Sequence, residues 1–148
     1  LALASNQMKY SLLDRHIESN GVLAAARELG ITVIAYSPLE QGLLTGKYHR
    51  QPELIRSRPG PRKWMAGFRN SGLKRSRPLI DELGAMARAH GATEGQIALA
   101  WLYQFHGNVV VIPGASRAEQ AEENQGALQV KLSSRELERL DQLSRQFL

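Results

Sequence analysis

Residues 109–117 read VVVIPGASR, and this stretch carries the clearest fold signal in the chain. Four consecutive β-branched apolar residues are typical of a strand buried in a parallel sheet. Pro113 and Gly114 end the strand, and the acidic residues from Glu119 onward suit the positive first turn of a helix. We therefore predict a strand over 109–112 that leads directly into a helix, with Ser116 as its N-cap.

A second buried strand is predicted over 31–36, which reads ITVIAY. It follows a run of good helix formers over 22–29 that ends at Gly30, a residue suited to the left-handed conformation that terminates helices. A shorter strand candidate of mixed polarity lies at 6–10. Consecutive buried strands separated by helices predict an α/β fold with a parallel sheet.

The remaining helices have recognisable start and stop signals. Pro78 lies near the predicted start of a helix that Gly91 ends, and residues 93–96 (TEGQ) and 133–136 (SSRE) have the form of capping boxes. The expected architecture has about three parallel strands with flanking helices. Because so short a sheet leaves two edges with unpaired backbone groups, we expect neighbours from missing chain, a second copy or another partner.

The composition excludes several classes of protein. The 148 residues are 43% hydrophobic and include no cysteine, which argues against a disordered chain and excludes a disulfide-stapled secreted scaffold. No apolar run approaches the roughly 18 residues of a membrane-spanning helix. The N-terminal stretch LALASNQMKYSLLDRH lacks the apolar centre of a signal peptide. We expect a cytoplasmic protein with no membrane partner and no metal site.

The formal net charge of +5 comes from one segment. Between Lys47 and Arg77 lie ten cations and a single acid, Glu53, together with several prolines and glycines. Because these residues favour irregular backbone, we predict a long basic loop over 48–75. It is either a flap that binds phosphate through its arginines or a solvated loop whose charge has no specific partner. No nucleic-acid-binding module surrounds it, so we do not expect nucleic acid as a partner.

Ligands of parallel α/β proteins bind at the C-terminal ends of the strands, so residues there are candidate site residues. Gln7 offers an amide that can bond a carboxamide or can instead satisfy backbone groups of the sheet. Tyr36 either offers a ring face to a planar ligand or is an ordinary tyrosine at the rim of the core. Residues 113–117 (PGASR) lead into a helix N-terminus, which favours a phosphate, although a Pro-Gly turn alone is a common structural element.

Three stretches together resemble a known family. SNQMKYS (5–11), VIAYSPLEQGLLTGKY (33–48) and VVVIPGASRAEQAEEN (109–124) are similar, in this order and spacing, to the last three βα units of an aldo-keto reductase. The resemblance covers nearly the whole chain. It implies that residues 1–148 are the C-terminal part of a (β/α)8 barrel, from a family that reduces aldehydes and ketones by hydride transfer from NADP(H).

The resemblance also implies how individual residues bind NADP(H). Gln7 would bond the nicotinamide carboxamide, and Tyr36 would stack on the nicotinamide ring. The other matching residues would form a belt over the pyrophosphate (Ser37, Pro38, Leu39, Gly42 and Lys47), hold the 2′-phosphate (Gly114, Ser116 and Arg117) and surround the adenine (Gln120, Glu123 and Asn124).

The main departure from the resemblance concerns catalysis. The family's Asp, Tyr, Lys and His tetrad belongs to earlier strands and matches no position here, and none of the four histidines lies in a matching context. We therefore assign no catalytic residue. The expected function is NADP(H) binding by the C-terminal part of an aldo-keto reductase, which needs the N-terminal part of the barrel to reduce a small carbonyl substrate. The alternative is a non-catalytic partial barrel that self-associates as a dimer or higher oligomer.

Overall fold

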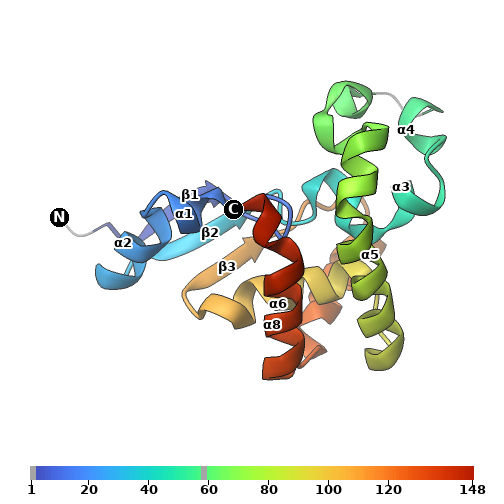
Figure 1. The fold of residues 1–148 in the computed structure, drawn as a ribbon. Helices are drawn as coiled ribbons and strands as arrows, with labels where there is room; N and C mark the ends of the chain where they lie inside the picture. The colour runs from blue at the N-terminus through green and yellow to red at the C-terminus, as the bar shows by residue number, and fades with distance from the viewer. Residues whose placement is uncertain (1–2, 58–59) are drawn as a thin grey trace.

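A computed structural model describes residues 3–57 and 60–148 and contains a three-stranded parallel sheet (Figure 1). The strands, in spatial order, are β1 (Ser5–Lys9), β2 (Thr32–Tyr36) and β3 (Val109–Ile112). In the register, Gln7 is paired with Ile34, and Ile34 is paired with Val110. The predicted α/β fold with three parallel strands is confirmed, with each strand within one residue of its expected bounds.

Helices cover one face of this sheet. Val33, Ala35 and Val109 are buried on that face, where α2 (Val22–Glu28) packs on β2 and α6 (Glu94–His106) packs on β3. Side chains alternate between the two faces of a strand, so these three residues define the covered side of the sheet.

The opposite face of the sheet is open within the described part of the chain. Gln7 is exposed in the middle of β1, and Tyr36, Val110 and Ile112 are 39%, 47% and 45% exposed. These side chains are uncovered because the helices that pack on the sheet lie on its other side. A sheet with one helix-covered face and one inward face is what a segment of a barrel presents.

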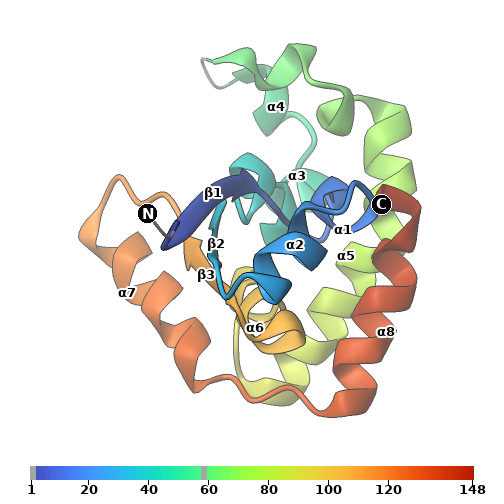
Figure 2. The same ribbon diagram turned by 90° about the vertical axis from the view of Figure 1, so that its left-hand side faces the viewer.

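The other helices surround the sheet and extend beyond the C-terminal ends of its strands, toward which the strand arrows point (Figures 1 and 2). The α-helices are α1 (His16–Ser19), α3 (Lys47–Arg50), α4 (Leu54–Ser57), α5 (Asn70–His90), α7 (Ala118–Gly126) and α8 (Ser134–Ser144). The 3-10 turns are η1 (Glu40–Thr45), η2 (Pro61–Trp64), η3 (Ala66–Phe68), η4 (Ala127–Gln129) and η5 (Arg145–Phe147).

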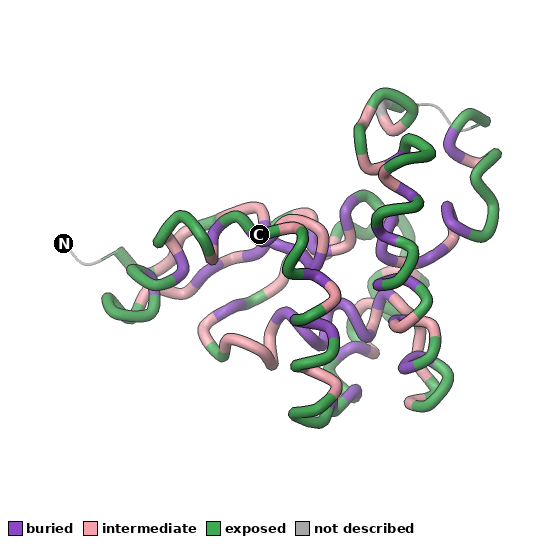
Figure 3. The backbone as a smooth tube through the Cα atoms, in the orientation of Figure 1, coloured by how far each residue is buried: buried purple, intermediate pink, exposed green. Residues whose placement is uncertain are grey.

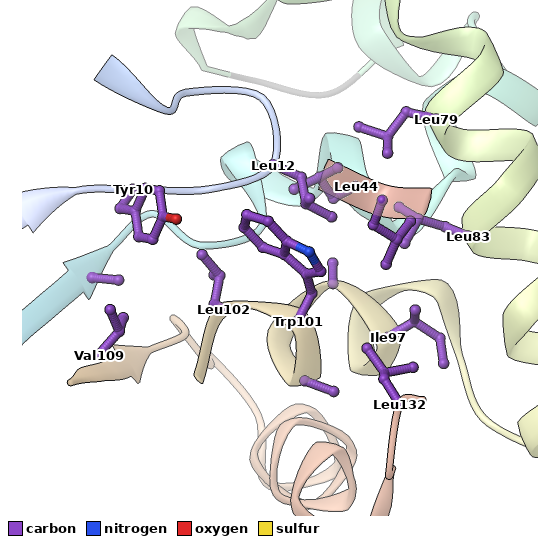
Figure 4. Close-up of a cluster of buried hydrophobic side chains, with 14 of the residues drawn as sticks. Tyr10, Leu12, Leu44, Leu79, Leu83, Ile97, Trp101, Leu102, Val109 and Leu132 are labelled. Carbon is purple, nitrogen blue, oxygen red and sulfur yellow. The ribbon is translucent and has the colours of Figure 1, made fainter. Parts of the chain in front are cut away.

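The main hydrophobic core lies around Trp101 on α6 (Figure 4). The Trp101 side chain is fully buried, and its Nε1 donates a hydrogen bond to the Leu137 carbonyl oxygen at 3.1 Å. Figure 3 shows buried residues along much of α6, which includes a continuous buried run from Ile97 to Leu102. This run is buried because α6 packs against β3, α5 and α8.

A buried ionic cluster joins the turn after β1 to the C-terminal helix. The Arg15 side chain is 2% exposed, and its Nη2 lies 2.6 Å from Glu18 Oε2 and 2.7 Å from Asp141 Oδ1. Arg15 Nη1 also donates to Ser144 Oγ at 2.8 Å, and the guanidinium lies 5.0 Å from the centre of the Trp101 ring. The Arg15 side chain therefore links the segment after β1 to α8, which lies more than a hundred residues later in the sequence.

The capping motifs predicted from the sequence are confirmed. Thr93 Oγ1 accepts a hydrogen bond from the Gln96 backbone at 3.3 Å, and the Gln96 side chain accepts one from the Thr93 backbone at 3.0 Å. Ser133 and Glu136 form the same reciprocal pair at the start of α8. Gly91 ends α5 in the left-handed conformation, with φ 61°.

The start of α5 differs from its prediction. The helix begins at Asn70 rather than near Pro78, which lies inside it. Proline within a helix removes one backbone donor and leaves the carbonyl four residues earlier, that of Lys74, without its partner. Both Lys74 and Pro78 are exposed, so water can satisfy that carbonyl and the helix continues through the proline.

The segment predicted as a basic loop over 48–75 is instead a small helical lobe with its own core. We call the described residues of 47–77 the basic lobe; it comprises α3, α4, η2, η3 and the start of α5, and it projects beyond the sheet (Figure 1). Tyr48 and Phe68 are buried and meet edge to face, with ring centroids 5.1 Å apart. Leu43, Ile55 and Leu73 complete this second cluster. The expectation of irregular backbone is wrong because these apolar side chains bury one another despite the intervening prolines.

His49 attaches α3 to the start of α5 within the basic lobe. Its imidazole is almost fully buried, and Nε2 lies 2.8 Å from Ser76 Oγ. Burial, assisted by the nearby charge of Arg77, lowers the pKa of His49 to about 4. The imidazole is therefore neutral at neutral pH, which suits a structural contact in a buried position.

Candidate functional site

The loops that follow β2 and β3 line an open cavity of about 670 Å³. This volume lies within the roughly 300–1,000 Å³ that is usual for small-molecule and cofactor sites. The predicted cofactor-binding residues that line it are Tyr36, Ser37, Pro38, Leu39, Gly42, Lys47, Gly114, Ser116, Gln120, Glu123 and Asn124. The structure therefore brings together residues from two separate loops and from α7, as the strand-end argument expects.

The loop after β2 is wound through left-handed backbone conformations. Ser37, Glu40 and Gln41 have φ values of 53°, 46° and 53°, and Gly42 follows with φ 89°. For residues other than glycine this conformation costs on the order of 1–2 kcal/mol each, and such strain gathers at functional sites. Most residues of this loop, from Ser37 to Gly42, line the cavity.

Lys47 lies against this wound loop at the cavity. A Cβ atom added to Gly42 would lie 3.2 Å from both Cε and Nζ of Lys47, so the missing side chain makes room for the lysine. The ammonium also lies 4.9 Å from the centre of the Tyr48 ring, a favourable cation–π position. Thr45 Oγ1 donates to the Gly42 carbonyl at 2.8 Å and closes the turn.

A buried carboxylate anchors the same loop to the end of β1. The Glu40 side chain is 11% exposed; Lys9 Nζ lies 3.0 Å from its Oε1, and Ser11 Oγ donates to the same oxygen at 3.2 Å. Lys9 also pairs with Asp14 at 2.9 Å. We did not predict this anchor, because its partners are about thirty residues apart and no local pattern connects them.

The loop after β3 presents small residues and the N-terminus of α7. Among residues 3–57 and 60–148, nothing lies within 4 Å of the position that a Cβ atom would take at Gly114, so the backbone there is open to a ligand. Arg117, not Ser116, is the N-cap residue of α7. The prediction for Ser116 is wrong because Gln120 Oε1 accepts hydrogen bonds from both its backbone N–H (2.9 Å) and its Oγ (3.0 Å).

Two predicted site residues do not line the cavity. Gln7 lies in the middle of β1, paired with Ile34, rather than at the strand end as we expected. Its side chain lies on the same open sheet face as Tyr36, since both continue the alternation through Ile34. Arg117 is exposed beside the cavity, at the start of α7.

The composition of the basic segment indicates a possible flap but does not indicate which of its residues reaches the cavity. Arg62, from η2 of the basic lobe, lines the cavity. Its Nε donates to the Gln41 carbonyl at 3.3 Å. This cation adds to Lys47 and to the helix N-terminus, so the positive groups come from three separate segments.

The lining suits a planar ring joined to phosphate groups. Tyr36 provides a partly exposed ring face, while Lys47, Arg62 and the α7 N-terminus provide positive charge and backbone donors.

Within 3–57 and 60–148, no three His, Asp or Glu side chains gather in a way that could hold a metal ion. None of the helices described in these ranges is long and apolar enough to cross a membrane.

Comparison with known proteins gives consistent matches. The sequence matches the profile of the Aldo/keto reductase family over residues 1–145. It is 35% identical over 137 residues to the aldo-keto reductase str7 of Strobilurus tenacellus, covering 91% of this chain and 40% of that protein. It is 37% identical over 132 residues to the aldo-keto reductase yakc of Schizosaccharomyces pombe, whose name specifies NADP(+), covering 86% of this chain and 37% of that protein.

The fold also matches a solved structure. A crystal structure of a thermostable aldo-keto reductase in complex with the inhibitor epalrestat superimposes with a TM-score of 0.66 and 35% sequence identity. The match covers 94% of this chain and 39% of that one.

A parallel α/β unit with one helix-covered face and a cofactor-sized cavity at its strand ends defines part of a (β/α)8-barrel protein. The chain belongs to the aldo/keto reductase family. It spans 37–40% of the length of the two curated relatives described above, and its three strands match part of the family's barrel.

Proposed function

We propose that this chain is the NADP(H)-binding C-terminal part of an aldo-keto reductase. The observation that carries the proposal is the cavity that combines the Tyr36 ring face, the left-handed loop after β2 and the N-terminus of α7. The NADP(+) in the name of the Schizosaccharomyces pombe relative gives further support.

The side chains of the cavity suit the nicotinamide ring and the pyrophosphate of this cofactor. Tyr36 would lie against the nicotinamide ring, with Gln7 on the same sheet face. Lys47 and Arg62 would neutralise the pyrophosphate as it passes along the loop after β2. When bound, NADPH supplies the hydride that reduces the carbon of a carbonyl group.

The 2′-phosphate of the adenosine half would sit at the start of α7. Backbone N–H groups at a helix N-terminus and the helix dipole favour an anion. Ser116 and Arg117 flank this position, and among the described residues the Arg117 side chain has no hydrogen-bond or ion-pair partner. Arg117 is therefore available to form a charge-assisted hydrogen bond to the phosphate.

We expect Arg117→Ala to weaken NADPH binding by about ten- to hundredfold and to leave NADH binding almost unchanged. A hydrogen bond to a charged group contributes about 1.5–3 kcal/mol, and only NADPH carries the 2′-phosphate. Calorimetric titration of the pure chain with each cofactor measures both affinities. Arg135→Ala is the matched control, because it removes an exposed arginine from the first turn of another helix, α8. Equal loss of affinity for the two cofactors would contradict the role of Arg117.

The chemical step is proposed to need groups from outside these 148 residues. We assign no residue of this chain to the family's tetrad, so we expect the chain to bind NADPH without reducing a reactive aldehyde. A steady decrease in NADPH absorbance with aldehyde, in the same samples used for the titration, would contradict this assignment.

A second candidate function is that of a self-associating partial barrel. It is favoured by the open sheet face, where Tyr36, Val110 and Ile112 are each more than a third exposed. A second copy of the chain would cover these side chains and pair the strand edges. We expect gel filtration to give a dimer or larger species; a single monomer peak at 16.4 kDa would contradict it.

A further inference from the structure

The basic lobe contains another hollow, of about 490 Å³, whose described lining residues are all different from those of the strand-end cavity. Arg56, Lys63 and Arg69 line it, and the largely buried residues Ile55 and Phe68 contribute its apolar part. The three cations come from α4, from η2 and from the residue before α5. The packing of the lobe, rather than a continuous run of sequence, brings them together.

The three cations of this hollow have no acidic partner among the described residues. None of its three cations has a side-chain hydrogen bond or ion pair among the described residues, whereas Arg50 of the same lobe contacts Glu94, and Arg77 lies 3.9 Å from Asp81. Among the described lining residues, Glu53 is the one acid. Like charges held around one hollow repel each other, and an anionic ligand would relieve that repulsion.

An exposed aromatic ring lies next to the hollow. Trp64 is 71% exposed, and Lys63 Nζ lies 5.3 Å from the centre of its ring. The indole therefore reports on the position of the Lys63 ammonium. The chain has only one other tryptophan, Trp101, which is fully buried in the main core.

We propose that this hollow is a second anion site, which binds a ligand with several phosphate groups. The planar guanidinium groups of Arg56 and Arg69 bond phosphate oxygens in a forked geometry, and Lys63 adds a compact positive charge. Three cations around one hollow favour a polyphosphate over a single phosphate. The same chemistry is offered by a free polyphosphorylated molecule and by the backbone of a polynucleotide.

The test is titration of the full chain with inorganic tripolyphosphate. We expect saturable binding by calorimetry and a change in Trp64 fluorescence, because a phosphate at Lys63 changes the surroundings of the indole. Trp64→Phe should lose the fluorescence change but keep the heat of binding. Arg56→Gln combined with Arg69→Gln should weaken binding by about tenfold or more, the effect expected for lost charge-assisted hydrogen bonds.

The control is Lys131→Gln combined with Arg135→Gln. These two exposed cations lie just before and at the start of α8, so the pair removes the same net charge away from the lobe. The control should bind tripolyphosphate almost as well as the wild type. Arg117→Ala should also keep the fluorescence change, which separates this site from the strand-end cavity. Absence of binding, or equal weakening in the two double variants, would overturn the proposal.

A single-stranded oligo(dT) probe distinguishes the two sources of phosphate. Affinity at least tenfold tighter than that of tripolyphosphate, with a steep decrease on addition of salt, assigns the hollow to a polynucleotide backbone. Equal or weaker affinity assigns it to a free polyphosphate. Either result supports the site, provided that the Arg56 and Arg69 substitutions weaken both ligands.

Discussion

Replacing Arg15 with methionine is expected to lower the free energy of unfolding by about 3–5 kcal/mol. The substitution keeps an apolar stem against Trp101 but removes the cation that Glu18 and Asp141 share. Asp141 keeps Arg145 at 2.7 Å, whereas the mostly buried Glu18 loses its only arginine partner among the described residues. An uncompensated buried charge costs far more than a lost surface contact. Urea denaturation followed by circular dichroism measures the change.

Arg139→Met is the control for this substitution. Arg139 pairs with Glu82 at 3.2 Å, and its side chain is 51% exposed. A surface ion pair of this kind contributes about 0–1 kcal/mol. If both variants lost the same small amount of stability, the Arg15 cluster would not be a buried structural contact.

The same cluster determines how the Arg15 variant should respond to acid. Burial alone would raise the pKa of Glu18, but the His106 imidazole, whose Nε2 lies 3.5 Å from Glu18 Oε1, and hydrogen bonds from Arg15 and Tyr10 outweigh it and lower the pKa to about 2. The unfolded chain therefore takes up this proton first, and the stabilisation present above about pH 4.5 is lost as the pH falls toward 2. Because removing Arg15 moves the pKa of Glu18 upward, the variant should lose less stability over this interval than the wild type.

The parts of the fold that follow from local pattern were predictable. The strands at 31–36 and 109–112 are short apolar runs between glycine or proline signals, and the capping boxes at 93–96 and 133–136 need only four residues each. The Arg15 cluster was not predictable, since it joins residues 126 positions apart. No property of the segment around Arg15 indicates that its charge is buried.

The candidate site was predictable only in part. The resemblance indicated most of the residues that line the cavity, though not Arg62. The left-handed conformations of Ser37, Glu40 and Gln41 have no sequence signal, because none of them is glycine. Arg62 reaches the cavity through the packing of the basic lobe. That packing depends on contacts such as Tyr48 with Phe68, which form across a segment whose composition indicates irregular backbone.

Replacing Gly72 with alanine is expected to lower the free energy of unfolding by about 3 kcal/mol, near the upper end for overpacking. A Cβ atom at this position would lie 2.7 Å from the Gly67 carbonyl oxygen and would also meet the Ala66 carbonyl oxygen. Both oxygens are backbone atoms, so no side chain can move aside. The added methyl group would push η3 away from α5 and disturb the small core of the basic lobe. Urea denaturation measures the loss, and amide hydrogen exchange locates it in the lobe.

Gly84 provides a control within the same helix. A Cβ atom there would lie 3.6 Å from Arg88 Nη1 and 3.7 Å from Glu94 Oε1, which are ordinary contact distances to flexible side chains. Alanine is favoured over glycine inside a helix by about 1 kcal/mol. We therefore expect Gly84→Ala to raise the free energy of unfolding, whereas Gly72→Ala lowers it. The opposite signs separate steric contact from helix propensity, because both substitutions add the same methyl group to α5. Higher stability of both variants than of the wild type would contradict the close contact between η3 and α5 at Gly72.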